Sequence, residues 1–176
     1  MSKSDNTSYK KPISTDFSDG FYDWSIFIIN LYLRVQQILK IDYESFMILQ
    51  IVVGYHVSNL NKTGSSSISQ LTFRFEEIVN EKALQIPKLT VTSIASALNM
   101  PRETVKRKVD ALIKKKYLSL DHNKSITLGI NYQNVFQAFA LETTHDLGKV
   151  MTRWSSKGYI DKLMSLIKAT LSLIHI

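Results

Sequence analysis

Three features of this 176-residue sequence predict a mainly helical fold. Apolar residues recur at helical spacing in four segments, which are residues 21–41, 43–59, 132–154 and 159–174. Stretches that interrupt helices separate these segments, such as residues 61–67 and 155–158. Clear strand patterns are short and fall within residues 117–128, although residues 71–84 are ambiguous. We therefore expect a helical core with one small β-hairpin, flanked by N- and C-terminal helices.

The helices before residue 88 are expected to serve as core or dimerisation elements, in a region spanning 21–87. Asp42 is a predicted N-cap, because its carboxylate can accept from the first N–H groups of the helix 43–59. That helix is apolar nearly all round, which predicts burial inside the monomer or against a second subunit. Residues 1–20 are polar without an apolar period and are expected to be disordered.

Residues 131–176 are expected to form two C-terminal helices that take part in dimerisation. Asn131 is the predicted cap of the first, and its apolar face is expected to hold Val135, Phe136, Phe139 and Leu147. The second is expected over 159–174, with apolar Ile160, Leu163, Leu166 and Ile167. The last six residues (LSLIHI) resemble a translated sequencing-adapter remnant, so they carry no functional weight.

Composition narrows the classes of function. The chain has no cysteine, which excludes disulfides and thiolate zinc sites, and together with the absence of a signal peptide this predicts a cytoplasmic protein. The apolar stretches 24–35 and 46–57 are too short for membrane spans. The net charge of +7 is concentrated in residues 88–124, which carry nine basic and three acidic side chains. Such a window suits a polyanion such as DNA, although a solvated lysine-rich face is the alternative.

Residues 90–128 contain the pattern of two short helices followed by a hairpin. Ala95 is small where the second helix would cross the first, and Asn99 tolerates the positive φ of a tight turn. Pro101 suits the start of the second helix, whose Val105, Val109, Leu112 and Ile113 form one apolar stripe. Two short strands around Asp121–Lys124 complete the pattern. Helix, turn, helix and hairpin in this order predict a winged helix-turn-helix over residues 88–130, with a three-helix core and a β-hairpin wing.

The run Arg102-Glu103-Thr104-Val105-Lys106-Arg107 resembles the recognition-helix motif of CRP/FNR-type bacterial regulators. The resemblance covers about 40 residues and implies base contacts by Arg102, Glu103 and Arg107, with a phosphate contact by Thr104. The β-roll effector domain of that family is absent, because the residues before Pro87 look helical. Nothing therefore supports cyclic-nucleotide binding.

The whole-chain layout is similar to that of MarR-type regulators, in which terminal helices flank a winged helix and form a dimer. Residues 61–87 depart from it as an insertion, and the wing is shorter and lacks the usual Asp-x-Arg pattern. The resemblance implies a homodimer and a small-molecule effector, whose cavity Trp24, Tyr32, Phe46 and Tyr55 could line. Aromatic residues on buried helices are, as the alternative, ordinary core.

The sequence thus predicts a sequence-specific transcription regulator that binds double-stranded DNA, with its recognition helix in the major groove and its wing on the backbone. Five lysines are expected to make nonspecific phosphate contacts or to be solvated charges: Lys106, Lys108, Lys114, Lys115 and Lys116. Lys124 at the hairpin tip is expected to touch the DNA backbone or the minor groove. The alternative is a winged-helix module that binds another protein. No catalytic motif is present, and no cofactor is expected. Glu142 and His145 have metal-ligand spacing without a second copy, so no metal site is expected.

Overall fold

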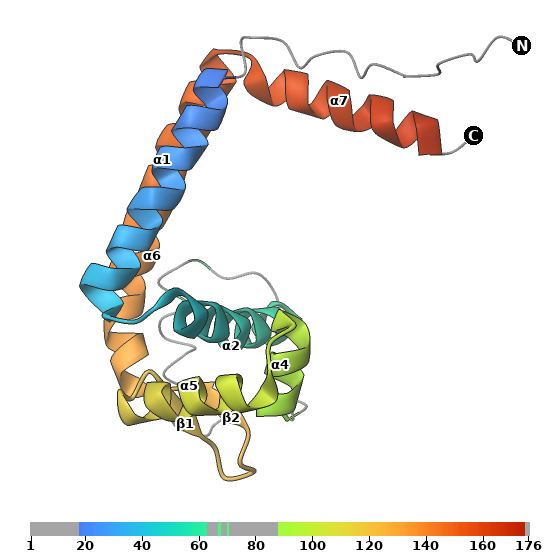
Figure 1. Ribbon diagram of the computed structural model, residues 1–176. Coiled ribbons are helices and arrows are strands. Elements are labelled where there is room, and N and C mark those ends of the chain that lie inside the picture. Colours follow the sequence, from blue (N-terminus) through green and yellow to red (C-terminus); the bar gives the residue numbers. More distant parts are fainter. Residues whose placement is uncertain (1–17, 63–66, 68–69, 71–87, 175–176) are drawn as a thin grey trace, which may run out of the picture. The chain divides into compact units, whose positions relative to one another are not determined.

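The computed structural model describes residues 18–62, 67, 70 and 88–174, with side chains described up to Lys168 (Figure 1). It is mainly helical and has one two-stranded antiparallel sheet, as predicted. The chain divides into two compact units, one of residues 1–29 with 146–176 and the other of residues 30–145. The ambiguous segment 71–84 and most of the predicted loop 61–67 lie outside the described residues, as do residues 1–17 of the predicted disordered tail. The prediction is wrong for residues 18–20, which form the start of the first helix. Among the described helices, none is both long and apolar enough to cross a membrane.

Helix α1 (Ser18–Arg34) begins in the first unit and ends in the second, where a π-helical turn, η2 (Val35–Leu39), continues it. Lys40 ends this turn in the left-handed conformation, with φ of 52°. Helix α2 (Tyr43–Asn61) follows after two residues. The predicted cap is confirmed, because the Asp42 carboxylate accepts from the Ser45 N–H at 2.8 Å.

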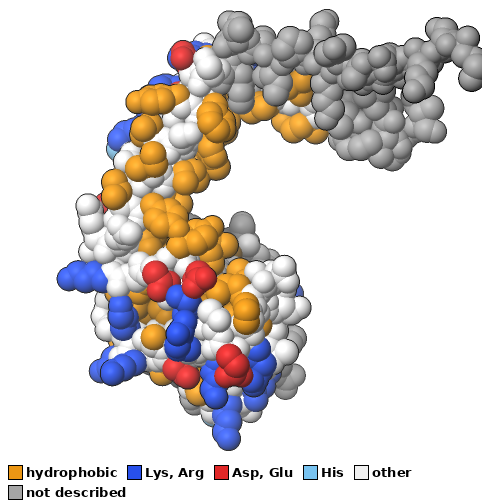
Figure 2. Space-filling view, viewed as in Figure 1, with side chains coloured by type: hydrophobic (Ala, Val, Ile, Leu, Met, Phe, Trp, Pro, Cys, Tyr) orange, Lys and Arg blue, Asp and Glu red, His pale blue; other side chains and the backbone are white. Residues whose placement is uncertain are grey.

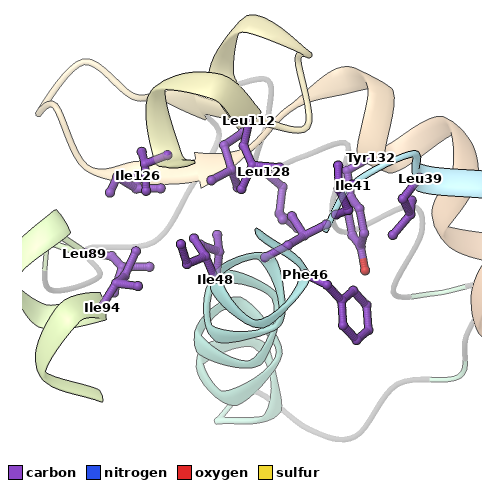
Figure 3. Close-up of a cluster of buried hydrophobic side chains, with 14 of the residues drawn as sticks. Leu39, Ile41, Phe46, Ile48, Leu89, Ile94, Leu112, Ile126, Leu128 and Tyr132 are labelled. Carbon is purple, nitrogen blue, oxygen red and sulfur yellow. The ribbon is translucent and has the colours of Figure 1, made fainter. Parts of the chain in front are cut away.

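The second unit is built around α2, α4 (Val91–Leu98), α5 (Arg102–Lys114) and the hairpin of β1 (Leu118–Leu120) and β2 (Ile126–Leu128). The strands pair with Leu118 opposite Leu128 and Leu120 opposite Ile126. Figure 3 shows how α2 contributes Ile48 to a cluster with Ile94 of α4 and Leu128 of β2. These side chains are fully buried, which is the main stabilising contribution to such a unit. The predicted helix, turn, helix and hairpin are thus present at the predicted residues.

Helix α6 (Ile130–Ser156) crosses the boundary between the units, and α7 (Tyr159–Ile174) lies in the first unit. The predicted cap at Asn131 is wrong, because α6 begins at Ile130 and the Asn131 side chain donates instead to the Lys115 carbonyl at 2.7 Å. Phe136 and Phe139 are buried as predicted, whereas Leu147 is exposed. Helix α7 begins at the predicted residue, but its apolar Leu166 and Ile167 are exposed.

His56 of α2 is buried against β2, and its Nε2 lies 3.2 Å from the hydroxyl of Thr127. Its Nδ1 is buried with no hydrogen-bond partner among the described residues. Burial lowers the pKa of His56 from 6.5 to about 4, although the Asp121 carboxylate acts in the opposite direction. The structure therefore holds this imidazole in its neutral form.

The pKa of His56 predicts an acid-dependent loss of stability. Since the folded pKa is the lower one, the unfolded chain takes up a proton first, and the stabilisation present above pH 6.5 is lost as pH falls towards 4. We expect the free energy of unfolding to fall by about 2 kcal/mol between pH 7 and pH 5 from this group alone. Urea unfolding of wild type and His56→Gln at both pH values measures the difference. The exposed hairpin residue His122 provides the matched control, and an equal effect of His122→Gln would contradict the assignment to His56.

Candidate nucleic-acid interface

The turn between α4 and α5 sets where the exposed face of α5 begins. Asn99 adopts the predicted left-handed conformation, with φ of 50° and ψ of 44°. The Met100 N–H donates to the Ala95 carbonyl at 3.0 Å, which closes the end of α4. Pro101 then precedes α5 with φ of −57°, and its carbonyl accepts from the Val105 N–H at 3.1 Å. The chain thus reverses within three residues and brings α5 against α4.

One face of α5 is buried and the opposite face carries basic side chains. Val105, Val109 and Leu112 lie in the core, as predicted from their spacing. A helix advances about 100° per residue, so Arg107 lies about 200° around the axis from Val105, opposite the buried stripe. Lys106 and Arg107 are exposed, and no hydrogen bond or ion pair joins either of them to another described residue. Thr104 is half-buried at the edge of the core.

Arg102 and Glu103, at the start of α5, form an ion pair with each other. The Arg102 Nη1 lies 2.9 Å from the Glu103 Oε1, and its Nε lies 3.4 Å from the hydroxyl of Thr92 on α4. Both side chains of the ion pair are exposed, so a ligand can reach them, and a surface pair of this kind contributes little stability. Thr92 is a neighbour that the motif in α5 did not identify, because it lies ten residues earlier in the sequence.

Lys108 does not share the exposed face of Lys106 and Arg107. Its Nζ lies 2.9 Å from a carboxylate oxygen of both Asp42 and Glu44, at the start of α2, and only 13% of its side chain is exposed. Burial lowers the pKa of Lys108, but the two carboxylates outweigh this effect and raise it overall. Burial by itself raises the pKa of Asp42, because it disfavours the charged carboxylate. Hydrogen bonds from Ser45 and Lys108 outweigh this effect, so the pKa of Asp42 lies below its ordinary value. The structure thus places Lys108 in a link between α5 and α2, apart from the exposed face of Lys106 and Arg107.

Lys115 is also engaged within the protein. Its Nζ donates to the Lys40 carbonyl at 2.6 Å, so a second lysine joins the end of α5 to the segment before α2. Lys114 and Lys116 remain exposed beside it. Of the lysines predicted to contact DNA backbone, those facing outward on and just after α5 are therefore Lys106, Lys114 and Lys116.

The hairpin turn presents Lys124 at its tip. The Asp121 N–H donates to the Ser125 carbonyl at 3.0 Å, and the Ser125 N–H donates to the Asp121 carboxylate at 2.7 Å. Lys124 takes a left-handed φ of 58° within this turn and is exposed. Behind the turn, Ile126 donates its N–H to the Leu89 carbonyl at 2.9 Å, which anchors β2 to the residue before α4. The position of Lys124 is thus determined by a hydrogen-bonded turn on a buried strand.

Figure 2 shows several Lys and Arg side chains over α5 and the hairpin, interspersed with few acidic ones. In residues 88–124 the acidic side chains are Glu103, Asp110 and Asp121. Lys108 is neutralised by carboxylates from outside this window. The other basic side chains of the window are exposed, although Lys115 donates to the Lys40 carbonyl and Arg102 is paired with Glu103. The arrangement offers a polyanion a helix face and a hairpin tip, both basic.

The other predicted site residues have partners of their own. The Glu142 carboxylate binds the Arg34 guanidinium at 3.1 Å, and no three His, Cys, Asp or Glu side chains of the described segments come together as metal ligands. Trp24 packs against Trp154 in the first unit, whereas Phe46 packs against Phe139 in the second. Tyr32 stacks on Tyr43 in the second unit. A small-molecule effector stays a prediction.

Comparisons of the chain with protein-family models, with curated protein sequences and with solved structures found no match.

Proposed function

We propose that this chain is a sequence-specific transcription regulator that binds double-stranded DNA through a winged helix-turn-helix of residues 88–130. Helix α5 would enter the major groove with Arg107 at the centre of its exposed face, and Lys124 of the hairpin would contact the phosphate backbone. The observation that carries the proposal is the layout of α5, whose buried stripe faces the core while Lys106 and Arg107 face outward without partners among the described residues. An α-helix is about 10–12 Å across with its side chains, which matches the width of the major groove, about 12 Å.

We expect two classes of contact with the DNA. Arg107 and the Arg102–Glu103 pair can reach base edges, since guanidinium groups pair with guanine and a carboxylate accepts from cytosine. Thr104, Lys106 and Lys124 would contact phosphates, which position the protein without reading sequence. The Glu103 carboxylate would have to exchange its bond with Arg102 for contacts to DNA, which makes Arg107 the more independent reader.

A fluorescence-anisotropy titration with random duplex DNA at several salt concentrations tests the proposal directly. Binding that weakens steeply with salt is expected, because each neutralised phosphate releases counterions. Selection from a randomised duplex pool should then enrich a defined motif. If the chain does not bind duplex DNA at low salt, the proposal is wrong, and a winged-helix module that binds an acidic protein becomes the better explanation of the basic face.

The different surroundings of Lys106 and Lys108 predict different effects of their replacement. Lys106→Gln should reduce the slope of log binding constant against log salt by about 0.9, as expected for one lost phosphate contact. Lys108→Gln should leave that slope unchanged, and should lower the free energy of unfolding by about 1 kcal/mol because Asp42 and Glu44 lose their shared cation. Salt titrations and urea unfolding of both variants measure the pair of effects. A reduced slope for Lys108→Gln would return this lysine to the interface.

A further inference from the structure

The ammonium group of Lys108 on α5 is fully occupied by carboxylate oxygens. Its Nζ donates to both oxygens of Asp42, at 3.0 and 2.9 Å, and lies 2.9 Å from Oε2 of Glu44. An ammonium group has three N–H donors. These three oxygens can therefore satisfy all of them, which leaves no donor of Lys108 for a phosphate.

The start of α2 holds the two carboxylates in place. Asp42 caps the helix, since its Oδ1 also accepts from the Ser45 N–H at 2.8 Å. Glu44 lies in the first turn, where the partial positive charge of the helix N-terminus favours a carboxylate. The side chains of Asp42 and Glu44 are 62% and 54% exposed, whereas that of Lys108 is 13% exposed. Solvent therefore meets two negative charges and little of the cation at this edge of α5.

Lys115 shows what the carboxylates add to a simple hydrogen bond. Its ammonium group also donates to a neighbouring segment, at the Lys40 carbonyl. A carbonyl carries no net charge, and the Lys115 side chain remains exposed, so its positive charge can still attract phosphates. The charge of Lys108, by contrast, is more than cancelled by Asp42 and Glu44.

The position of Lys108 on α5 lies beside the expected path of the DNA backbone. Thr104 precedes it by four residues, so the two half-buried side chains are neighbours on one side of the helix. With α5 in the major groove as proposed, Thr104 would contact a phosphate. An unpaired Lys108 would then reach the backbone about one helical turn further along. Asp42 and Glu44 instead present negative charge on this side.

We propose that Asp42 and Glu44 are positioning residues for DNA binding, which withdraw Lys108 from the phosphate backbone and repel the backbone on this side of α5. The face of Lys106 and Arg107 is then the attractive side of the helix. The inference rests on the proposed function and adds a means of limiting sequence-independent affinity, because nonspecific binding depends almost wholly on phosphate contacts. Base contacts then account for a larger share of the affinity for a specific site.

A double-mutant cycle in the full chain tests the inference through the salt dependence of binding to a random duplex. Asp42→Asn combined with Glu44→Gln removes both charges, while asparagine caps a helix as well as aspartate does. The released Lys108 should steepen the slope of log binding constant against log salt by about 0.9, and should tighten binding about five- to tenfold at about 0.1 M salt. In the Lys108→Gln background, the same two substitutions should leave the slope unchanged, because no cation is released.

Asp110→Asn is the matched control for the loss of a negative charge. Asp110 is an exposed residue of α5 that lies about 200° around the helix from Lys108. Removing its charge weakens the general repulsion of DNA, so its effect should be the same with and without Lys108.

Glu44→Gln alone is the milder variant, because it keeps the Asp42 cap and the ion pair between Asp42 and Lys108. It should give a smaller gain in affinity that also requires Lys108. This variant keeps the inference testable if the double substitution unfolds the chain, which circular dichroism and urea unfolding would reveal.

The possible outcomes separate this inference from the proposed function. A steeper slope that requires Lys108 would support the inference. An unchanged slope would overturn it, as would an equal increase in both backgrounds, because the carboxylates would then act only through their general negative charge. A wild type that does not bind random duplex at low salt would refute the proposed DNA binding itself, and the inference with it.

Discussion

Arg107→Ala is expected to reduce the discrimination between a selected DNA site and random duplex by the contribution of one base contact. The guanidinium lies opposite the buried stripe of α5 and has no ion-pair partner among the described residues, although Glu103 lies four residues before it. An arginine that pairs with a base edge contributes about 1–3 kcal/mol of discrimination, which corresponds to a factor of about 5 to 150. Anisotropy titrations with the selected and the random duplex at one salt concentration measure the ratio of the two binding constants.

Lys106→Ala is the matched control for this experiment, because Lys106 precedes Arg107 on the same helix and is also exposed. Its loss should weaken binding to the selected and the random duplex alike. Both variants should unfold at the urea concentration of the wild type, since neither side chain is packed in the core. If Arg107→Ala weakens binding to both duplexes equally, Arg107 contacts phosphate and the base-reading part of the proposal fails.

Gly129→Ala is expected to cause the largest loss of stability among the substitutions considered. Gly129 follows β2, and a Cβ at this position would overlap the backbone carbonyl of Lys116 and approach the carbonyl of Leu118. Both carbonyls belong to the hydrogen-bonded connection that leads from α5 into β1, and Lys116 also accepts from the Asn131 N–H at 3.0 Å. Neither can move aside without breaking that connection. We expect a decrease of about 3 kcal/mol in the free energy of unfolding, measured by urea denaturation.

The comparison for this variant is Gly54→Ala in the middle of α2. An added Cβ meets nothing there, and alanine is preferred to glycine in a helix, so stability should rise by about 0.5–1 kcal/mol. Gly129→Ala is compared with Gly54→Ala by the size of the change in the free energy of unfolding. If Gly129→Ala lowers it by no more than about 1 kcal/mol, the connection after β2 adapts to a side chain and the prediction is wrong.

Local patterns in the sequence were sufficient to predict the elements around the candidate interface. The positive φ of Asn99, the start of α5 after Pro101 and the turn at Asp121–Lys124 depend on residues within a few positions of one another. The buried stripe from Val105 to Leu112 follows from helical periodicity alone. The same is true of the Asp42 cap, which needs only a carboxylate three residues before a free backbone N–H.

Predictions failed or fell short where contacts over long sequence separations decide. Lys108 looks like one more exposed lysine, but carboxylates 66 and 64 positions earlier in the chain remove it from the surface. Asn131 resembles a helix cap, but its side-chain amide donates to the Lys115 carbonyl instead. No spacing rule within α5 or α6 could identify these partners.

The sequence by itself determined the helical fold class, the positions of the turns and the basic character of residues 88–124, because each depends on local propensity or on composition. Only the tertiary structure decided which cations face outward, where the chain divides into units, and which apolar stripes stay exposed. Periodicity shows that a helix face is apolar, but burial depends on whether another element is present to cover it. The apolar face of α5 packs against α2 and α4, whereas exposed apolar side chains in the first unit are not covered by other described residues.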